Sequence, residues 1–390
     1  MASKQLLILC TAGAGMEELV ANELRRLFVG ELKLFQGKLL FEIESDNLHF
    51  VLNSKFVERV FLCVMYDKLD PVTDFRTLMS SVENSLNSVV WDDFAHTRDV
   101  WLSYLNTSNG CESTNNRTQK LPAKLFIKLR PKYLIRYTHQ VRSILSTALE
   151  NGLALNFSAS ASAEVNVLLS NNNLFIGLSL TNLPLAHRSH VKHFGLRSTS
   201  AAALAIDARD GLALDPMCGK GILLLEAATN QMTFTSPKPF LYLVGCDVSA
   251  DQIELSRENF NSLRTTSTIV WDLVLCDLES TPFRCAIFDH VLCDFPFGKK
   301  YGARCGTTEC FDSMTLRNSY QIWIENISTL LNDQGKCSVL VPSHLGAHSA
   351  RLFEKEHMHL VQELPISLGV TKATIIRTER RKLNTRDEDA

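Results

Sequence analysis

The spacing of apolar residues over the first hundred positions predicts alternating strands and helices. An apolar run at residues 5–11 predicts a strand, and the leucine spacing of residues 19–28 is typical of an amphipathic helix. Residues 32–44 then predict a hairpin, and residues 57–65 predict another strand. We therefore expect an α+β region over residues 1–105.

A polar stretch interrupts this pattern at residues 106–120. It is rich in Asn, Ser and Thr, contains an Asn-Gly turn signal and has no apolar anchor, so we expect a linker loop. Beyond it, residues 124–130 alternate as a strand does, and residues 135–149 have helical spacing. Three more strands are expected, at residues 153–158, 164–169 and 174–181.

The second half of the chain repeats a strand-then-helix pattern. A predicted helix at residues 199–206 precedes it, and the expected strands lie at residues 212–215, 242–247, 269–277, 287–293 and 336–342. Helical stretches separate these strands, which favours an α/β fold with a parallel sheet.

Length and composition set limits on this interpretation. At about 150 residues per domain, 390 residues give two or three domains. An apolar content of 45% and a charged content of 21% exclude a disordered, collagenous or coiled-coil protein. The apolar start is too short for a secretory signal, and no apolar run reaches the roughly 18 residues of a membrane span. We expect a protein that is neither secreted nor inserted in a membrane.

The eleven cysteines include no Cys-x-x-Cys pair. They indicate reduced thiols, and Cys276, Cys285 and Cys293 fall in or near apolar strands, where we expect them to be buried. Cys305 and Cys310 are the closest pair, but no second pair or histidine cluster completes a zinc site. We therefore expect no protein-bound metal.

The net charge of −2 conceals a strong segmental imbalance. The net charge is −4 over residues 1–120, +7 over residues 121–200 and −5 over residues 201–390. An excess of +7 in 80 residues indicates a phosphate-binding face, although an ordinary solvated surface has the same composition.

The first candidate site is the sequence Leu-Asp-Pro-Met-Cys-Gly-Lys-Gly, which ends at Gly221. A strand ends in Asp215, a glycine-bearing loop with Gly219 turns tightly, and a helix begins. Such a loop lets the backbone approach a ligand at the carboxyl end of a sheet. It matches neither the dinucleotide fingerprint nor the P-loop, so alone it also fits a structural turn.

Acidic residues end the next two predicted strands as well. Asp247 is placed to accept hydrogen bonds from a ribose diol, and Asp277 from an adenine amino group. A single Asp at such a position is more often a helix cap. Three successive strands ending in Asp indicate one adenosine-shaped site.

The fourth strand runs into Asp294-Phe295-Pro296-Phe297-Gly298. The exocyclic amine of a base is a poor nucleophile because its lone pair is delocalised into the ring. An acceptor at Asp294 and a backbone carbonyl beside Pro296 could bind its two N–H groups, and Phe297 could stack on an extruded base. A plain Pro-Gly turn is the alternative interpretation of this segment.

This constellation resembles the class I S-adenosylmethionine-dependent methyltransferases that modify amino groups. The segments Cys10–Glu17 and Gly195–Thr199 are further similar to the THUMP-containing RNA methyltransferases, as is residue range 124–181. The resemblance implies a ferredoxin-like region at 1–105, a linker at 106–120, a THUMP RNA-binding domain at 121–185, a connector at 186–204 and a class I Rossmann-like methyltransferase domain at 205–390.

The resemblance also implies an activity and partners. It implies methyl transfer from S-adenosylmethionine to guanosine N2 in structured RNA, together with a small zinc-binding activator subunit of the Trm112-like kind. The most similar subgroup is associated with U6 small nuclear RNA, which implies a nuclear location, and a sister group modifies transfer RNA, which leaves the cytoplasm open.

The resemblance assigns roles to individual residues. The catalytic set is Asp294, Pro296 and Phe297, and the cofactor-binding set is Thr199, Asp215, Pro216, Cys218, Gly219, Gly221, Asp247 and Asp277. The basic candidates for RNA are Lys124, Lys128, Arg130, Lys132, Arg136, Arg142, Arg188 and Lys192. For any one of these basic residues, a solvated position with no ligand is an equal alternative.

Other functions use similar residues. Protein-glutamine and DNA-adenine methyltransferases share the Asp/Asn-Pro-aromatic chemistry, and the basic α+β unit favours RNA over both. A non-catalytic RNA-binding scaffold is a further alternative, against which the intact Gly219, Asp247 and Asp294 argue.

Overall fold

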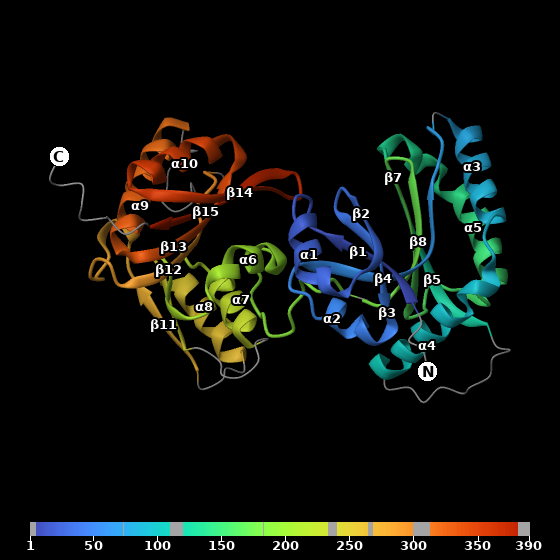
Figure 1. The fold of residues 1–390 in the computed structure, drawn as a ribbon, viewed down its shortest axis with the longest axis horizontal. Helices are drawn as coiled ribbons and strands as arrows, with labels where there is room; N and C mark the ends of the chain where they lie inside the picture. The colour runs from blue at the N-terminus through green and yellow to red at the C-terminus, as the bar shows by residue number, and fades with distance from the viewer. Residues whose placement is uncertain are drawn as a thin grey trace. The chain divides into compact units, whose positions relative to one another are not determined.

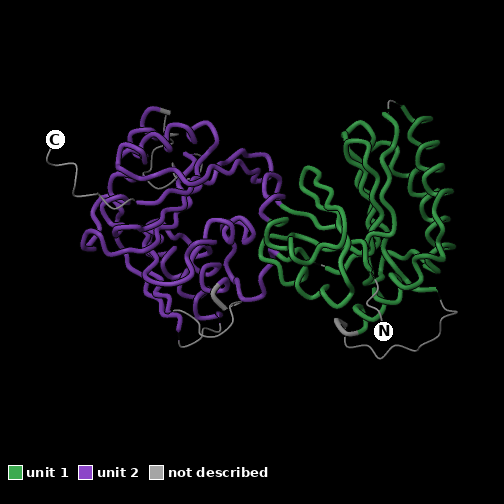
Figure 2. The backbone as a smooth tube through the Cα atoms, in the orientation of Figure 1, with its two compact units in different colours: residues 1–12, 20–185 green, residues 13–19, 186–390 purple. Residues whose placement is uncertain are grey.

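The computed structural model describes residues 5–72, 74–109, 120–181, 183–232, 240–263, 268–298 and 313–380. The chain divides into two compact units, drawn in green and purple in Figure 2. The first comprises residues 1–12 and 20–185, and the second comprises residues 13–19 and 186–390. Each unit is built on its own sheet.

The first unit contains one eight-stranded sheet with the order β2-β3-β1-β4-β8-β7-β5-β6. This sheet passes through both predicted α+β regions, because β4 pairs antiparallel with β8. Its strands are β1 (Gln5–Ala12), β2 (Val29–Phe35), β3 (Lys38–Glu44), β4 (Val57–Lys68), β5 (Leu121–Leu129), β6 (Leu155–Phe157), β7 (Ala163–Ser170) and β8 (Asn173–Ser179).

Helices of the first unit include two that the hydrophobic pattern did not predict, α3 and α4. Helix α3 begins with a capping box in which Asp74 accepts from the Thr77 N–H at 2.9 Å. Helix α4 extends to Asn109 within the predicted linker, and residues 110–119 of that linker lie outside the described residues. The helices are α1 (Glu17–Leu24), α2 (Leu48–Leu52), α3 (Phe75–Asn87), α4 (Ala95–Asn109) and α5 (Thr138–Gly152).

The second unit has a seven-stranded sheet with the order β11-β10-β9-β12-β13-β15-β14. The first five strands in this order pair in parallel, as the sequence pattern predicts, and β15 joins antiparallel to β13. The strands are β9 (Gly211–Asp215), β10 (Leu241–Asp247), β11 (Ile269–Leu275), β12 (Phe288–Asp294), β13 (Leu331–Pro342), β14 (Met358–Leu368) and β15 (Thr371–Arg380). The α/β fold class is confirmed.

Helices cover both faces of this second sheet (Figure 1). Side chains of α9 and α10, among them Tyr320 and Phe353, pack with Leu214, Val291 and Val339 of the strands in one apolar core. Helices α6, α7 and α8 cover the opposite face. Their bounds are α6 (Ser198–Leu204), α7 (Ile222–Met232), α8 (Ala250–Ser262), α9 (Ser313–Leu330) and α10 (Gly346–Lys355).

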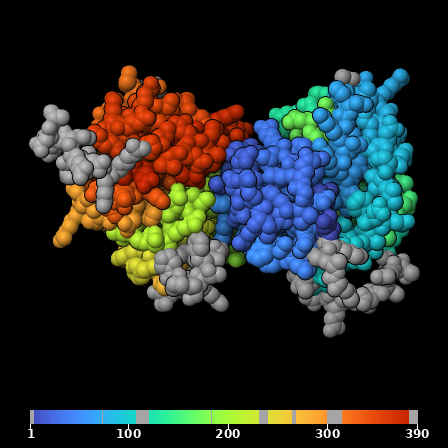
Figure 3. Space-filling model, in the orientation of Figure 1, coloured from blue at the N-terminus to red at the C-terminus, as the bar shows by residue number. Residues whose placement is uncertain are grey.

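The β14–β15 hairpin was not predicted from the sequence. It lies at one edge of the sheet, and much of the visible surface of this unit is its C-terminal part, orange and red in Figure 3. Val361 of β14 is 57% exposed, so this strand lacks a continuous apolar face. Arg377 is buried in β15 and donates to the Ala203 carbonyl at 2.5 Å.

The structure tests the expected burial of three cysteines and the expectation that no segment spans a membrane. Cys276 is half-buried and Cys293 is buried, but Cys285 is exposed because it lies in the turn before β12, so its predicted burial is wrong. Cys305 and Cys310 lie outside the described residues. Among the described helices, none combines the length and apolar character that crossing a membrane requires.

Candidate functional site

The candidate site lies where the strand order of the second sheet reverses. From β9 the chain continues to β10 and β11 on one side, whereas β12 and β13 lie on the other. Ligands of open α/β sheets bind outside the carboxyl ends of the strands at such a switch point. The tips of β9, β10 and β12 bring Asp215, Asp247 and Asp294 to this edge, as the sequence predicted.

Hydrogen bonds tie the loop after β9 to the tip of β10. The Asp247 carboxylate accepts from the Gly219 N–H at 2.9 Å through one oxygen and from the Ser249 N–H at 2.9 Å through the other. The Cys218 N–H donates to the Cys246 carbonyl at 2.7 Å. Each carboxylate oxygen can accept a second hydrogen bond, so Asp247 both shapes the loop and remains able to bind a ligand.

Glycines at two loop positions meet different needs. Gly219 and Gly221 have φ angles of 50° and 75°, which disfavour any side chain. A Cβ at Gly221 would lie 2.4 Å from Ser256 Oγ of α8, whereas a Cβ at Gly219 would meet only Gln252 Oε1, at 3.8 Å. Gly221 therefore allows close packing against α8, and Gly219 leaves open space at the sheet edge.

Asp215 is buried at the centre of this edge. Its carboxyl accepts from the Met217 N–H at 3.2 Å. Burial raises the pKa of Asp215 well above its usual range; the Met217 N–H opposes that shift, and the charges of Asp294 and Asp247 add to it. Burial likewise raises the pKa of the neighbouring Cys218 thiol, which stays neutral.

Replacing Asp215 should change how stability depends on pH. Because the pKa of Asp215 is raised in the folded state, ionisation costs the folded protein stability as the pH rises above about 4 towards that raised pKa. Asn is isosteric and uncharged. We expect the Asp215→Asn variant, measured without ligand, to gain thermal stability over the wild type progressively from about pH 5 to about pH 8. A stability difference that stays constant or shrinks over this range would contradict the buried-carboxyl interpretation.

The remaining predicted cofactor residues lie in mixed surroundings. Asp277 is exposed just beyond β11, where it accepts from the Glu279 N–H at 3.0 Å, and the neighbouring Cys276 N–H donates to the Asp247 carbonyl at 3.2 Å. Pro216 is buried in the loop, and Thr199 is fully buried in α6. Asp277 therefore lies beside Asp247, whereas Thr199 has no surface for a ligand.

Tyr320 fixes the motif after β12. Asp294 is half-buried at the strand end, and the Phe295 N–H continues the sheet by donating to the Leu340 carbonyl at 3.1 Å. The Tyr320 hydroxyl donates to the Pro296 carbonyl at 3.0 Å, and the Phe295 ring packs edge-on against Tyr320 with ring centroids 5.0 Å apart. Tyr320 thus already bonds the Pro296 carbonyl, which makes the Phe295 carbonyl the candidate acceptor beside Pro296. Phe297 follows, half-buried.

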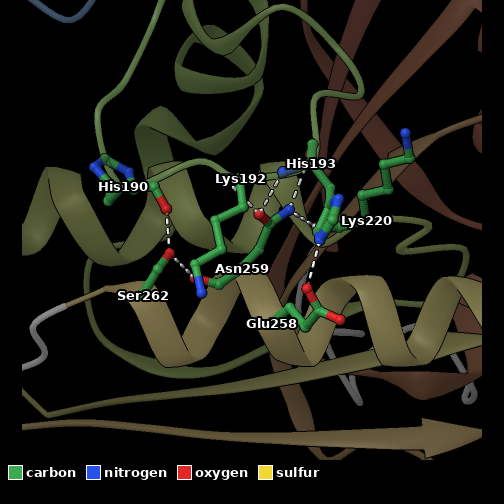
Figure 4. A network of polar contacts seen from close by, with 7 residues as sticks. All are labelled: His190, Lys192, His193, Lys220, Glu258, Asn259 and Ser262. Carbon is green, nitrogen blue, oxygen red and sulfur yellow. Dashed lines mark hydrogen bonds and ion pairs between the residues drawn. The ribbon is translucent and has the colours of Figure 1, made fainter.

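The part of the connector before α6 is hydrogen-bonded to helices α7 and α8 of the same unit. The Arg188 guanidinium forms a paired contact with the fully buried Glu226 of α7, with Nε 3.0 Å from Oε1 and Nη2 3.3 Å from Oε2. Arg188 thus has a structural partner, which argues against its predicted role in RNA binding. Lys192 is exposed, and its main-chain N–H donates to Asn259 at 2.9 Å (Figure 4).

Basic candidates in the first unit lie in three places. Lys124 and Lys128 alternate with Phe126, which is 46% exposed, on one face of β5, and Arg130 follows the strand. Lys132 and Arg136 lie exposed in the turn before α5. Arg142 donates to the Leu125 carbonyl at 2.9 Å, so its guanidinium is partly engaged by the main chain.

Two lysines on the same unit were missed. Lys33 lies 5.4 Å from the centroid of the Tyr66 ring, and Lys38 lies 5.8 Å from that of Phe175. Burial lowers the pKa of Lys38, and the charge of Lys128 lowers it further. Lys38 of β3 and Lys128 of β5 are therefore neighbours in space. Lys33 and Lys38 were overlooked because they belong to a segment with a net charge of −4; the alternation of Lys33 with Phe35 was the available signal.

Within the described ranges, no group of three or more His, Cys, Asp or Glu side chains could hold a metal ion. The roles assigned to individual site residues stay predictions.

Comparisons with known proteins find methyltransferases similar to this chain, most clearly over the second unit. A family model described as the RMKL-like methyltransferase domain matches residues 187–318. The U6 snRNA (guanine-N(2))-methyltransferase THUMPD2 of Bos taurus is 24% identical over 371 residues, covering 75% of this chain and 72% of that protein. The tRNA (guanine(6)-N(2))-methyltransferase THUMP3 of Mus musculus is 32% identical over 158 residues, covering 36% of this chain and 30% of that protein.

A solved structure shares the whole fold. The structure of SMU.472, which is complexed with SAH, matches with a TM-score of 0.66 at 12% identity, over 98% of this chain and 100% of that chain. The resemblance to THUMP-containing methyltransferases predicted from the motifs is confirmed by the sequence relatives.

Proposed function

We propose that this chain, whose second unit carries an RMKL-like methyltransferase domain, is an S-adenosylmethionine-dependent RNA methyltransferase that forms N2-methylguanosine. The observation that carries the proposal is the position of the Asp294–Phe297 motif. It follows β12 directly across the switch point from the glycine loop after β9. An amine-binding motif and a nucleoside-binding loop at one sheet edge are what methyl transfer to a base requires.

The residues at this edge fit S-adenosylmethionine. Space beside Gly219 and the carboxylates of Asp247 and Asp277 suit an adenosine with its ribose diol and amino group. Asp215 lies deeper, and its raised pKa suits a protonated carboxyl that supports the loop through Met217 rather than a charged ligand contact. When bound, S-adenosylmethionine supplies an electrophilic methyl group at this edge.

The chain's own residues hold and orient the guanine. Asp294 and the Phe295 carbonyl accept the two hydrogens of the exocyclic N2, which directs the nitrogen lone pair away from the ring plane. Tyr320 fixes the second acceptor because its hydroxyl bonds to the adjoining Pro296 carbonyl at 3.0 Å. Phe297 stacks on the extruded base. Asp294 need not be a strong base, since the proton leaves after the nitrogen has become positive.

We assign RNA binding in the first unit to the lysines that share the aromatic face of its sheet. Changing Lys38, Lys124 and Lys128 together to Gln should weaken RNA binding and flatten its salt dependence. Each lost phosphate contact should reduce the slope of log K against log salt by about 0.7 on single strands, and by close to the 0.9 of B-form DNA on double helices. Filter binding over a salt series measures this slope. The control is Lys372→Gln, which changes an exposed lysine of the second unit. An unchanged slope in the triple variant would argue against RNA binding at this lysine-bearing face.

The substrate we propose is U6 small nuclear RNA, with transfer RNA as the alternative. Support comes from the match over most of both chains to a bovine protein named as a U6 snRNA methyltransferase, whereas the match to the mouse tRNA enzyme covers only 30% of that protein. U6 as substrate entails a nuclear location; transfer RNA would allow the cytoplasm. Microscopy of the tagged chain distinguishes these locations.

We further propose a small zinc-binding Trm112-like activator that pairs with the edge of the second sheet. Strand β11 is an edge strand, and its Val270 and Leu275 are 40% and 58% exposed. An uncovered apolar edge strand favours pairing with another chain. Co-purification of the two proteins, and its loss on changing Val270 to Lys, tests this contact.

In vitro methylation tests the activity. Total RNA from cells that lack the enzyme is incubated with the chain and labelled S-adenosylmethionine, with and without the activator, and the labelled nucleotide is mapped. We expect N2-methylguanosine in U6. Label in tRNA instead of U6 would favour the alternative substrate. RNA binding without any methyl transfer would favour the non-catalytic scaffold over the proposed enzyme.

A further inference from the structure

Asn259 of α8 joins three segments of the second unit (Figure 4). Its side-chain oxygen accepts from the main-chain N–H groups of Lys192 and His193, both at 2.9 Å. Its side-chain nitrogen donates to the His193 carbonyl at 3.0 Å and to the Lys220 carbonyl at 2.9 Å. The side chain is fully buried, and these four bonds use its two donors and accept two hydrogens.

The Lys220 carbonyl belongs to the glycine loop. The peptide it forms with Gly221 is hydrogen-bonded through both of its polar groups: the Lys220 carbonyl accepts from Asn259 at 2.9 Å, and the Gly221 N–H donates to the Cys218 carbonyl at 2.7 Å. The preceding N–H, that of Gly219, donates to Asp247. Asn259 therefore supplies, from outside the loop, one of the two hydrogen bonds that fix the direction of this peptide plane between two glycines.

Lys220 adds a second link between the same segments. Its Nζ donates to the Phe194 carbonyl of the connector at 2.8 Å. The connector is also held by Ser262, which donates to the His190 carbonyl, and by Glu258, whose carboxylate lies 2.7 Å from His193 Nε2. Glu258 binds the connector, and Ser262 binds the connector and the main-chain carbonyl of Asn259 within α8, whereas the Asn259 side chain binds both the connector and the loop (Figure 4).

We propose that Asn259 is a positioning residue that holds the glycine loop in its ligand-binding orientation through its own hydrogen bond to the loop, while it also anchors the connector. It acts through the Lys220 carbonyl and need not touch the ligand. The identity of that ligand, S-adenosylmethionine, rests on the proposed function.

The Asn259→Asp substitution tests the link to the loop selectively. Asp keeps the oxygen that accepts from Lys192 and His193, but its second oxygen faces the Lys220 and His193 carbonyls and cannot donate when ionised. Loss of these bonds and the new repulsion should weaken S-adenosylmethionine binding about tenfold by calorimetry. The KM for the cofactor should rise by the same factor, while kcat at saturating cofactor stays within about twofold.

Matched controls remove connector contacts while the Asn259 side chain stays bonded to the Lys220 carbonyl. Glu258→Ala removes the bond to His193, and Ser262→Ala removes the bond to His190 together with one to the Asn259 main-chain carbonyl within α8. We expect the cofactor affinity of both variants to stay within about twofold of the wild type. If Asn259→Asp does not fold, Lys220→Met provides a surface change that removes the Nζ bond to Phe194; it should weaken cofactor binding about threefold with little change in thermal midpoint.

The outcomes separate the two proposals. A wild-type chain that binds no S-adenosylmethionine overturns the proposed function. A wild-type chain that binds it, together with a folded Asn259→Asp variant that binds equally well, overturns the positioning role alone. An equal loss of affinity in the Ser262 and Glu258 variants also overturns it, because general loosening of the connector would then explain the effect.

Discussion

The Asp294→Ala variant should lose methyl transfer almost completely while it still binds cofactor. Asp294 stands at the tip of β12 and is the side-chain acceptor in the proposed mechanism, so its loss would leave the guanine amine with only the Phe295 carbonyl. We expect kcat to fall by about a thousandfold, which corresponds to about 4 kcal/mol in the activation barrier. Single-turnover transfer of a labelled methyl group to RNA measures the rate, and calorimetry should give a cofactor Kd within about twofold of the wild type.

Two further variants sharpen this test. Asp294→Asn keeps one acceptor oxygen and loses the charge, so its rate should lie between those of the wild type and Asp294→Ala. Asp333, an exposed carboxylate near the start of β13, lies at the end of its strand opposite the site, and Asp333→Ala should transfer at the wild-type rate. Full activity of Asp294→Ala would remove Asp294 from the mechanism.

The second large effect is expected from Gly221→Ala. The new methyl group would lie 2.4 Å from Ser256 Oγ and 3.1 Å from Phe260 Cε2, in a residue whose φ of 75° already disfavours a side chain. We expect the free energy of unfolding to fall by about 2–4 kcal/mol, which combines overpacking with backbone strain. Cofactor affinity should fall by more than tenfold, because the loop must move away from α8. Urea unfolding and calorimetry measure the two losses.

Gly219→Ala is the matched comparison for this prediction. Its φ is also positive, at 50°, but the nearest atom to the added methyl group is Gln252 Oε1 at 3.8 Å. The free energy of unfolding should fall by only about 1 kcal/mol, from the strain of a side chain at positive φ. The added methyl group also occupies space proposed for the cofactor. Gly219→Ala should thus lower affinity with little loss of stability. A similar loss of stability in both variants would show that packing against α8 is not the reason for Gly221.

The parallel sheet could be predicted because its strands are buried on both faces. Strands β9 and β10 have nearly continuous apolar sequences that end in Asp215 and Asp247, and β12 has an apolar run just before Asp294. An acid at the end of such a strand marks the sheet edge in the sequence itself. The α/β class and the three acidic tips were accordingly predicted to within a residue or two.

Helices and strands that mix exposed and buried residues irregularly were not predicted from the hydrophobic pattern. Strand β14 has the exposed Val361 among its apolar residues, and α4 is mostly polar, so neither has a clear period. The predicted burial of Cys285 was wrong for a related reason, since the apolar residues that follow it belong to β12 and it belongs to the turn. The boundaries of the predicted linker and domains stay predictions.

The sequence by itself determined the chemistry at the site: the glycine loop, the acids at the strand ends and the Asp-Phe-Pro-Phe motif are local patterns whose neighbours along the chain define them. The tertiary structure alone decided which polar groups are already engaged. Arg188 is bonded to Glu226, the Pro296 carbonyl to Tyr320, and Asn259 to both the connector and the loop. These partners lie 24 to 67 residues apart in the chain, and a hydrogen bond depends on distance in space, which no local pattern records.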